Sequence, residues 1–339
     1  MTEHYKFSET REPIESAGLN KNEIKTINGL GLTFEDLQKL LGSQHIAEGS
    51  YALIFELPSM DEKIVAKAWK NPKRDSERVK YENAALRLLR MRNSKEAPRL
   101  MGYLKSATIL FEEKIEGSPI ENFDKITIDQ LAETIAKIHS IELNAYGKPL
   151  TQRRKGTKMD YLDDGIEKLR KALSLVTNQP EIILPIEQSI DKIQGEAKKK
   201  SDAFQDNSFT LIHFDLNRNN ILQSKNPERI ILVDWEQASA GDNAMDIAKM
   251  FLKLDFNKEQ KKEFLVEYKK RLSKKDEHFQ CRLDIYEMLV LINSLLWRLQ
   301  VLNNQPIQKS TETEKQFYAR VKSGFDYEFN SLQNFLSSK

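Results

Sequence analysis

The sequence predicts an α+β fold in which a small lobe built on an antiparallel sheet precedes a larger, mainly helical lobe. Strand-like apolar runs joined by turns gather between residues 51 and 111, and apolar residues at helical spacing dominate beyond 117. A chain of 339 residues is long enough for both lobes. We therefore expect a partly helical N-terminal extension at 1–45, the small lobe at 46–116 and the helical lobe at 117–339.

Charge balance and cysteine content exclude several classes of protein. The formal charge of +2 is the difference between 53 basic and 51 acidic side chains, so no overall field would draw the chain onto nucleic acid. Cys281 is the only cysteine, which rules out an intrachain disulfide and a cysteine-rich zinc site. We expect a reducing compartment and no nucleic-acid partner.

The sequence gives no sign of export or membrane insertion. Its first residues lack the apolar core of a signal peptide, and the most apolar stretch, Met288–Trp297, is short for a bilayer and interrupted by polar residues. We expect a cytoplasmic protein without membrane contact. The composition does not indicate an oligomeric state.

The expected elements of the small lobe follow from periodicity and turn residues. A helix over Thr33–Leu41 comes before it, and a second helix, which carries Glu82, is expected after Asn71-Pro72 with its cap near Asp75 or Ser76. The predicted strands are Tyr51–Leu57 and Lys63–Trp69, joined by a turn at Pro58–Glu62, and then Leu100–Leu104 and Thr108–Phe111.

The larger lobe reads as helices interrupted by one group of strands. Helical stripes lie at 129–141, 161–175, 246–254 and 285–302. Short apolar strands are expected at 209–213, 221–223 and 229–234, the last two joined by a turn at Asn226-Pro227.

The strongest chemical signal is His213-Phe-Asp215-Leu-Asn-Arg-Asn-Asn220, followed by a hairpin and Leu232-Val-Asp234-Trp-Glu. Phosphoryl transfer needs a carboxylate that orients and deprotonates a hydroxyl, a role for Asp215, and oxygen ligands for Mg²⁺, a role for Asn220 and Asp234. Taken alone, an Asp after a strand is often only a cap. The joint order matches the catalytic and metal-binding loops of kinases.

This segment resembles the aminoglycoside phosphotransferase and choline kinase family, whose loop typically reads His-Gly-Asp-Leu-His-Pro-Gly-Asn. Gly241-Asp-Asn-Ala-Met-Asp246-Ile-Ala also resembles the family's Gly-Asp-x-x-x-Asp-Leu-Ala, and the segment from Leu131 to His139 resembles its Leu-His helix. The resemblance covers about residues 46–300. It implies a two-lobed protein-kinase-like fold, ATP and Mg²⁺ as cofactors, and phosphate transfer to a hydroxyl of a small molecule.

Two departures from the family loop need an explanation. Phe214 replaces a usual Gly and Arg218-Asn219 replaces Pro-Gly, so we expect either a different backbone path or an Arg218 near the transferred phosphate. An exposed structural Arg218 is an equal alternative. We expect His213 and Asp246 to brace the loop, with Asp246 also capping the following helix, and His139 to serve packing.

On the nucleotide side, Lys67 is placed like the kinase lysine that holds the α- and β-phosphates. Glu82 on the following helix is its expected ionic partner, preferred to Glu77 because Glu82-Asn-Ala-Ala-Leu resembles the family's Glu-x-x-x-Leu. Lys63 and Lys70 compete with Lys67 for this role, and a solvent-facing glutamate is the alternative for Glu82.

Two further segments complete the expected nucleotide site. Gly49 and Ser50 would form the turn that covers the phosphates, although a plain hairpin turn would look the same. Glu113 and Ile115 fall where the resembled family presents backbone groups to adenine. Glu112 lies near the back of that pocket, where the family is usually apolar, and its presence has no explanation from the sequence.

Alternative functions are a protein kinase and a catalytically weak nucleotide-binding module. The stretch Trp235–Met245 is too short for a regulated activation segment, which argues for a small acceptor. The presence of Asp215, Asn220 and Asp234 argues against a weak module.

The acceptor is not named by the sequence. The resemblance places the acceptor pocket among the helices at about 150–200 and 255–339. There, Asp160, Asp163 and Asp164 would bind a cation or simply face water.

Overall fold

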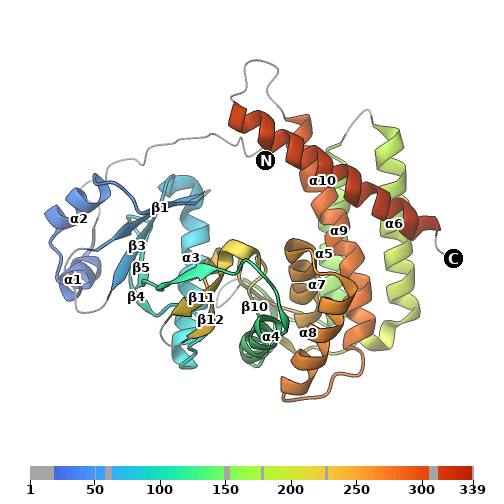
Figure 1. The fold of residues 1–339 in the computed structure, drawn as a ribbon, viewed down its shortest axis with the longest axis horizontal. Helices are drawn as coiled ribbons and strands as arrows, with labels where there is room; N and C mark the ends of the chain where they lie inside the picture. The colour runs from blue at the N-terminus through green and yellow to red at the C-terminus, as the bar shows by residue number, and fades with distance from the viewer. Residues whose placement is uncertain are drawn as a thin grey trace.

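The computed structural model describes residues 19–49, 51–57, 63–148, 153–176, 179–225, 228–304 and 312–337. Ser50 and the turns predicted at Pro58–Glu62 and Asn226-Pro227 lie outside these residues. The chain forms the predicted α+β fold, with a sheet-containing lobe beside a mainly helical one (Figure 1).

An antiparallel five-stranded sheet of order β1-β2-β3-β5-β4 forms the small lobe. Its strands are β1 (Ala47–Glu48), β2 (Ala52–Glu56), β3 (Ile64–Trp69), β4 (Leu100–Leu104) and β5 (Ile109–Glu113). The sequence predicted β2 to β5 but not the two-residue β1, and β5 extends two residues beyond its predicted end because Glu112 and Glu113 pair with Val65 and Ile64.

The two faces of this sheet have different partners. One face packs against α1 (Lys21–Gly29) and α2 (Phe34–Leu41), which share a hydrophobic cluster with residues such as Phe55 and Phe111. The sequence predicted α2 but not α1. Cross-strand neighbours share a face, so Lys67, opposite Leu110, lies on the other face, turned toward α3 (Pro72–Met91) and the larger lobe.

Helices begin earlier than their apolar stripes predict. The cap expected near Asp75 or Ser76 is instead Asn71, whose side chain accepts from Arg74 N, with Pro72 in the first turn. The caps of α4 (Lys125–His139) and α5 (Lys158–Leu173) are Asp124 and Thr157. A polar first turn carries no apolar stripe, so periodicity alone misses it.

The larger lobe holds two small sheets among its helices. β6 (Gly117–Pro119), β11 (Ile221–Lys225) and β12 (Glu228–Leu232) form a three-stranded sheet of order β12-β11-β6. The other sheet has the order β7-β10-β13-β8-β9 and consists of β7 (Glu142–Leu143), β8 (Tyr146–Gly147), β9 (Arg153–Arg154), β10 (Phe209–Ile212) and β13 (Ser239–Gly241). The loops that join these two sheets carry the sequence motif.

Helices surround the two small sheets. Besides α4 and α5 they are α6 (Pro180–Lys199), α7 (Asn243–Leu254), α8 (Lys258–Arg271), α9 (Phe279–Asn303) and α10 (Glu312–Ser337), with short 3-10 turns at η2 (Ser201–Phe204), η3 (Arg218–Asn220) and η4 (Trp235–Gln237). Figure 1 shows α10 lying across α9 and α6.

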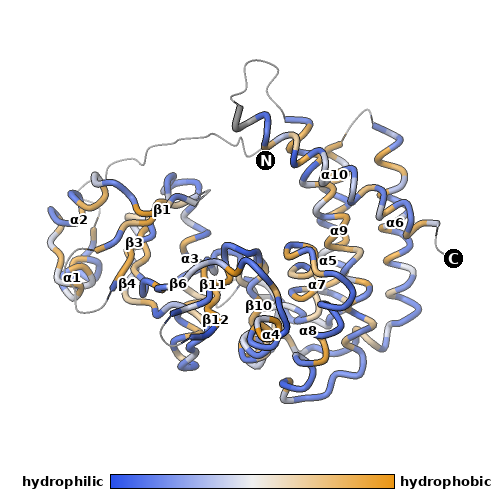
Figure 2. The backbone as a smooth tube through the Cα atoms, in the orientation of Figure 1, coloured by the Kyte–Doolittle hydropathy of each residue, from blue (hydrophilic) through white to orange (hydrophobic). Residues whose placement is uncertain are grey.

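The helix α9 is longer than its predicted apolar stretch. Among the described residues it alone is long and apolar enough to cross a bilayer by composition. It packs against α7, α10, α5 and α6, and residues such as Ile292 and Leu295 are fully buried. Figure 2 shows hydrophobic residues along α9 and β3, which fits a core helix and a core strand.

Candidate active site

The loop after β10 is held by the side chain of Asp246. Its two carboxylate oxygens accept from the backbone N–H of His213 at 2.9 Å and of Phe214 at 2.7 Å. Asp246, which was predicted to cap this helix, lies instead in the first turn of α7, and the cap is Asp242, which accepts from Ala244 N. Asp246 is therefore not the cap of α7, because both its oxygens are bonded to the loop and to His139.

His213 bonds through both ring nitrogens. Nε2 lies 2.9 Å from the carbonyl oxygen of Val233, and Nδ1 lies 3.3 Å from the backbone N–H of Asp215. A carbonyl only accepts and an N–H only donates, so the ring is neutral with its proton on Nε2. Burial lowers the pKa of His213, which favours the same state. The ring thus ties the loop to the strand end before Asp234.

Phe214 adopts the left-handed conformation, with a φ of 64°. A residue with a side chain is strained there, whereas glycine is not. We expected either a different backbone path or an Arg218 near the transferred phosphate. In the structure, Phe214 itself takes the left-handed conformation at the position where the resembled family has glycine. The Lys249 ammonium lies 3.9 Å from the centre of the Phe214 ring.

Asp215 and Asn220 face each other across the loop. The Asn220 amide donates to the Asp215 backbone oxygen at 2.8 Å and to Asp215 Oδ2 at 3.3 Å. Asn220 is buried, whereas its neighbour Asn219 is exposed. The backbone carbonyl of Asn220 accepts from Val233 N at 3.0 Å, which holds the loop against the residue before Asp234.

Lys67 joins the small lobe to the second loop. Its ammonium lies 3.0 and 2.8 Å from the two oxygens of Glu82 and 2.6 Å from Asp234 Oδ1. Glu82 also accepts from the backbone N–H of Trp235 at 3.1 Å. The predicted partners Lys67 and Glu82 do meet, and Asp234 joins them. Lys63 and Lys70 pair elsewhere, with Glu116 and Glu48.

Within this buried cluster Lys67 and Asp234 keep their charges through mutual contact, whereas burial raises the pKa of Glu82 to about 8 against the opposing effect of Lys67. Burial alone would lower the pKa of Lys67, but the carboxylates of Asp234 and Glu82 raise it well above its usual value. Burial likewise tends to raise the pKa of Asp234, and the Lys67 ammonium outweighs this and lowers it. Lys67 and Asp234 therefore stay charged at neutral pH.

A second polar network supports Asp246 from behind. His139, predicted to serve packing alone, is buried and also places Nε2 3.1 Å from Asp246 Oδ2 and Nδ1 2.8 Å from the Tyr268 hydroxyl. Arg282 holds the cap of α7, with Nε 2.7 Å from Asp242 Oδ2. Sequence reasoning missed Tyr268 and Arg282 because their partners lie far away along the chain.

The remaining predicted nucleotide residues are at the edges of the site. Gly49 follows β1, and its N–H bonds Ala52 O at 2.9 Å. Glu113 pairs with Ile64, so its side chain lies on the sheet face opposite Lys67, where it contacts Arg99. Within the described part of the chain, no backbone hydrogen bond uses Ile115.

Glu112 is on the same sheet face as Lys67, because it pairs with Val65 two residues before that lysine. Its side chain is 8 % exposed, and among the described residues no hydrogen bond to it is found. Burial raises the pKa of Glu112 to about 7, and Lys67 opposes this. This is the carboxyl that the sequence left unexplained.

Arg218 fits the structural alternative. Its guanidinium donates to the carbonyl of Glu121 and lies 5.0 Å from the centre of the Phe123 ring. These contacts tie the loop to the segment before α4.

Sequence reasoning missed Lys253 and Lys249 beside the catalytic loop, and also Lys148, whose charge acts on Lys249. Lys253 Nζ lies 3.4 Å from Asp215 Oδ1, and Lys249 lies one turn earlier on α7. Lys148 follows β8 and bonds the carbonyl of Gln237 at 3.4 Å. The spacing of Asp246, Lys249 and Lys253 on one helix face was the available signal.

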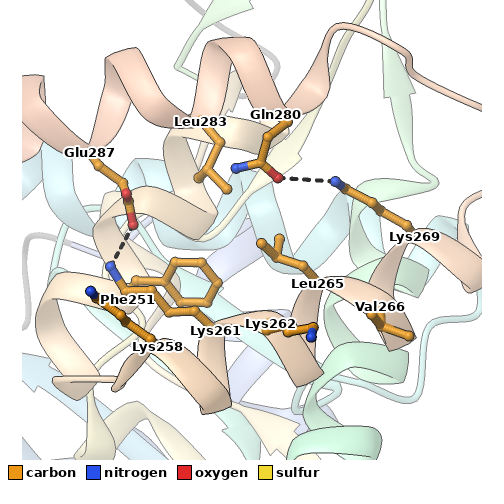
Figure 3. Close-up of a pocket in the computed structure, with 10 residues that line it drawn as sticks. All are labelled: Phe251, Lys258, Lys261, Lys262, Leu265, Val266, Lys269, Gln280, Leu283 and Glu287. Atoms are coloured by element: carbon orange, nitrogen blue, oxygen red, sulfur yellow. Dashed lines mark hydrogen bonds and ion pairs between the residues drawn. The ribbon is translucent and has the colours of Figure 1, made fainter.

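A pocket of about 400 Å³ opens elsewhere, between α7, α8 and α9. Figure 3 shows lysines around an apolar floor, with Phe251 contributed by α7. Phe251 is two residues from both Lys249 and Lys253, so it lies on the opposite face of α7. This pocket is therefore on the far side of α7 from Asp215.

The comparisons with known proteins agree with this geometry. The fold is that of the protein-kinase-like phosphotransferases. The sequence model of the Phosphotransferase enzyme family (APH) matches residues 58–282, and the chain belongs to that family. No curated protein matches the sequence significantly.

Solved structures share the fold at low identity. Choline kinase LicA from Streptococcus pneumoniae is 19% identical, with a TM-score of 0.54 over 83% of this chain and 91% of that one. An ethanolamine kinase from Plasmodium vivax is 16% identical, with a TM-score of 0.62 over 91% and 89%. The aminoglycoside phosphotransferase APH(4)-Ia is 15% identical, with a TM-score of 0.58 over 88% and 99%.

Proposed function

We propose that this protein transfers the γ-phosphate of ATP to a hydroxyl of a small molecule, with Mg²⁺ bound to the nucleotide. The observation that carries this proposal is the convergence of Asp215, Asn220 and Asp234 on one site, with Lys67 joined to Asp234. Family membership supports phosphotransfer, and a structure of the similar LicA is a complex with AMP. We also propose a cytoplasmic location.

The residues present fit a magnesium ion. Within the described residues, neither Asn220 Oδ1 nor Asp234 Oδ2 has a protein hydrogen-bond partner, because Asn220 bonds through its NH₂ group and Asp234 through Oδ1. Magnesium prefers oxygen ligands and commonly takes only one or two carboxylates, with phosphates and water completing its shell. The described residues hold no group of three or more His, Cys, Asp or Glu that could bind a metal. Bound Mg²⁺ would neutralise charge on the phosphates.

Asp215 is placed to act as the base. As the acceptor oxygen bonds to the γ-phosphorus, its proton passes to the Asp215 carboxylate, and the bond between that phosphorus and the oxygen of ADP breaks. Asn220 holds the Asp215 carboxylate in position through its amide. Lys67 supplies a fixed positive charge for the nucleotide phosphates, and Glu82 orients it.

The segment after Asp234 favours a small acceptor. Only η4 and β13 stand between Asp234 and the start of α7 at Asn243. This leaves no room for the long segment that forms a peptide platform in regulated protein kinases. The acceptor is therefore expected to be a small molecule rather than a peptide.

The test uses protein confirmed as unphosphorylated by mass spectrometry. We expect it to release ADP from Mg·ATP in the presence of small hydroxylated compounds, and mass spectrometry should find the phosphoryl group on the compound. Activity only after phosphorylation, or only on folded proteins, would favour the protein-kinase alternative. Nucleotide binding without any transfer would favour the weak module.

A further inference from the structure

Lysine side chains gather on the acceptor side of Asp215. On α7, Asp246, Lys249 and Lys253 lie at spacings of three and four residues, so they share the face that meets the catalytic loop. Lys253 reaches Asp215 Oδ1 at 3.4 Å, and Lys249 lies over the ring of Phe214, the residue before Asp215.

Lys148 brings a further positive charge to the same region. It lies 4.6 Å from the centre of the Tyr81 ring, so it reaches across to α3 of the small lobe. The positive charges of Lys253 and Lys148 both act on Lys249, whose pKa is lowered to about 8, chiefly by burial. These lysines are therefore electrostatic neighbours, with Lys249 partly buried and Lys253 exposed to solvent.

The carboxylates near these lysines are mostly engaged with other groups. Those that act on them are Asp215, Asp246, Glu236 and Glu328. Asp246 accepts from the loop backbone, Glu236 pairs with Arg78 at 3.1 Å, and Glu328 pairs with Arg298 at 3.1 Å. The cluster thus keeps an excess of positive charge beside Asp215.

Two of the three acidic residues that were expected either to bind a cation or to face water are used elsewhere. Asp160 forms the capping box of α5 with Thr157, and Asp164 pairs with Arg154 at 2.8 Å. Asp163 is exposed. Neither Asp160 nor Asp164 is therefore a ready partner for an ammonium group.

We propose that the acceptor is an alcohol that also carries an anionic group, a carboxylate or a phosphate, held by Lys249 and Lys253 with Lys148 beside them. This inference rests on the proposed function and goes beyond it by naming the substrate class. A cationic acceptor such as choline or an aminoglycoside would meet like charge at this place. Lys253 would also hold the acceptor's anion close to the base that takes its hydroxyl proton.

The test compares acceptors that share a skeleton and differ in charge. One series is glycerol, glycerate, glycerol 3-phosphate and 3-amino-1,2-propanediol, and the other is glucose, gluconate, glucose 6-phosphate and glucosamine. In at least one series an anionic member should have a kcat/KM at least about tenfold above its neutral and cationic counterparts, the scale of one charge-assisted hydrogen bond. The two anions in each series distinguish carboxylate from phosphate.

Variants separate acceptor binding from a general effect. Lys249→Met should raise KM for the anionic acceptor at least about tenfold and leave KM for ATP unchanged, so the preference for the anion falls. Lys253→Glu should shift the preference toward the cationic member. Lys262→Met, at the rim of the pocket in Figure 3, is the matched control and should change neither.

Several outcomes would overturn the inference. A preference of the wild type for cationic acceptors would contradict the inference, and so would transfer to none of the anionic compounds. If the protein still binds Mg·ATP in these cases, the proposed nucleotide site is not refuted. An equal loss for acceptors of every charge in Lys249→Met would assign the lysines to the transferred phosphate instead. Failure of the wild type to bind Mg·ATP at all would refute the proposed function together with this inference.

Discussion

Single residues set the electrostatics of the nucleotide side. Glu112 and Lys67 share a sheet face, yet Lys67 donates to Glu82 and Asp234, and among the described residues no hydrogen bond reaches the side chain of Glu112. A buried carboxyl without a hydrogen bond prefers its neutral form. At physiological pH, Glu112 is therefore near its point of titration, with its pKa raised by burial to about 7.

Glu112→Gln should change how stability depends on pH. A carboxyl whose pKa is about 4.5 when exposed and about 7 when folded binds more protons in the folded state between these values, so its contribution to stability is present below pH 4.5 and lost by pH 7. The unfolding free energy of the variant relative to wild type should therefore rise from pH 5 to pH 8. Urea unfolding at both pH values measures this.

Glu113→Gln, on the opposite sheet face, is the matched control for that experiment. If the difference between Glu112→Gln and wild type stays the same at pH 5 and pH 8, Glu112 titrates as an exposed carboxyl.

Phe214 shows how one side chain links strain to the acceptor side. Its left-handed backbone is held by the bond from its N–H to Asp246, and its ring meets the Lys249 ammonium. Strain of this kind persists at functional sites when the surroundings enforce it. The ring thus replaces a glycine while orienting a lysine of the proposed acceptor site.

At the scale of elements, hydrogen bonds and an ion pair join the loop after β12 to strand β3 and helix α3 of the small lobe. Asp234 follows β12, takes the left-handed conformation with a φ of 66°, and meets Lys67 of β3, while the next residue donates to Glu82 of α3. The two lobes are therefore connected at the place where we propose the nucleotide phosphates bind.

Asp234→Ala should remove the Mg²⁺-dependent part of nucleotide binding. A ligand that binds only the folded state at about 100 times its Kd stabilises it by about 2.7 kcal/mol. Wild-type protein should show a higher melting temperature with Mg·ATP than with ATP and a chelator, and this difference should largely vanish in the variant. Calorimetry of both proteins measures the difference.

Asp234→Ala also loses stability in the absence of nucleotide, because Glu82 is then the one hydrogen-bond partner left to Lys67 among the described residues. Comparing each protein with and without Mg²⁺ corrects for this loss. An undiminished Mg²⁺ effect in the variant would place the metal elsewhere.

For the molecule as a whole, the sequence predicted the features that depend on residues at fixed, short spacings along the chain. The order of strands and loops around Asp215 and Asp234, and the meeting of Lys67 with Glu82, follow from motifs with fixed offsets. Contacts between distant segments were missed, such as Arg282 with Asp242 and His139 with Asp246. Periodicity shows that a helix has an apolar face, but not which neighbour meets its polar face.

The lysines illustrate this limit. In sequence, Lys249 and Lys253 look like solvated charges on the polar face of a helix, which is the usual place for lysine. Only the packing of α7 against β10 and the loop turns that face toward Asp215. The acceptor side was for that reason less predictable than the motif.

The central claim is that Asp215 takes the proton of a small hydroxyl acceptor as phosphate is transferred from ATP. The most direct measurement is the turnover of Asp215→Asn with the best acceptor, measured as ADP release at saturating Mg·ATP. We predict a loss of at least about 100-fold, the usual scale of general-base catalysis, with little change in melting temperature. Asp163→Asn, which alters an exposed carboxylate, should keep full activity. Turnover near the wild-type rate in Asp215→Asn would contradict the account.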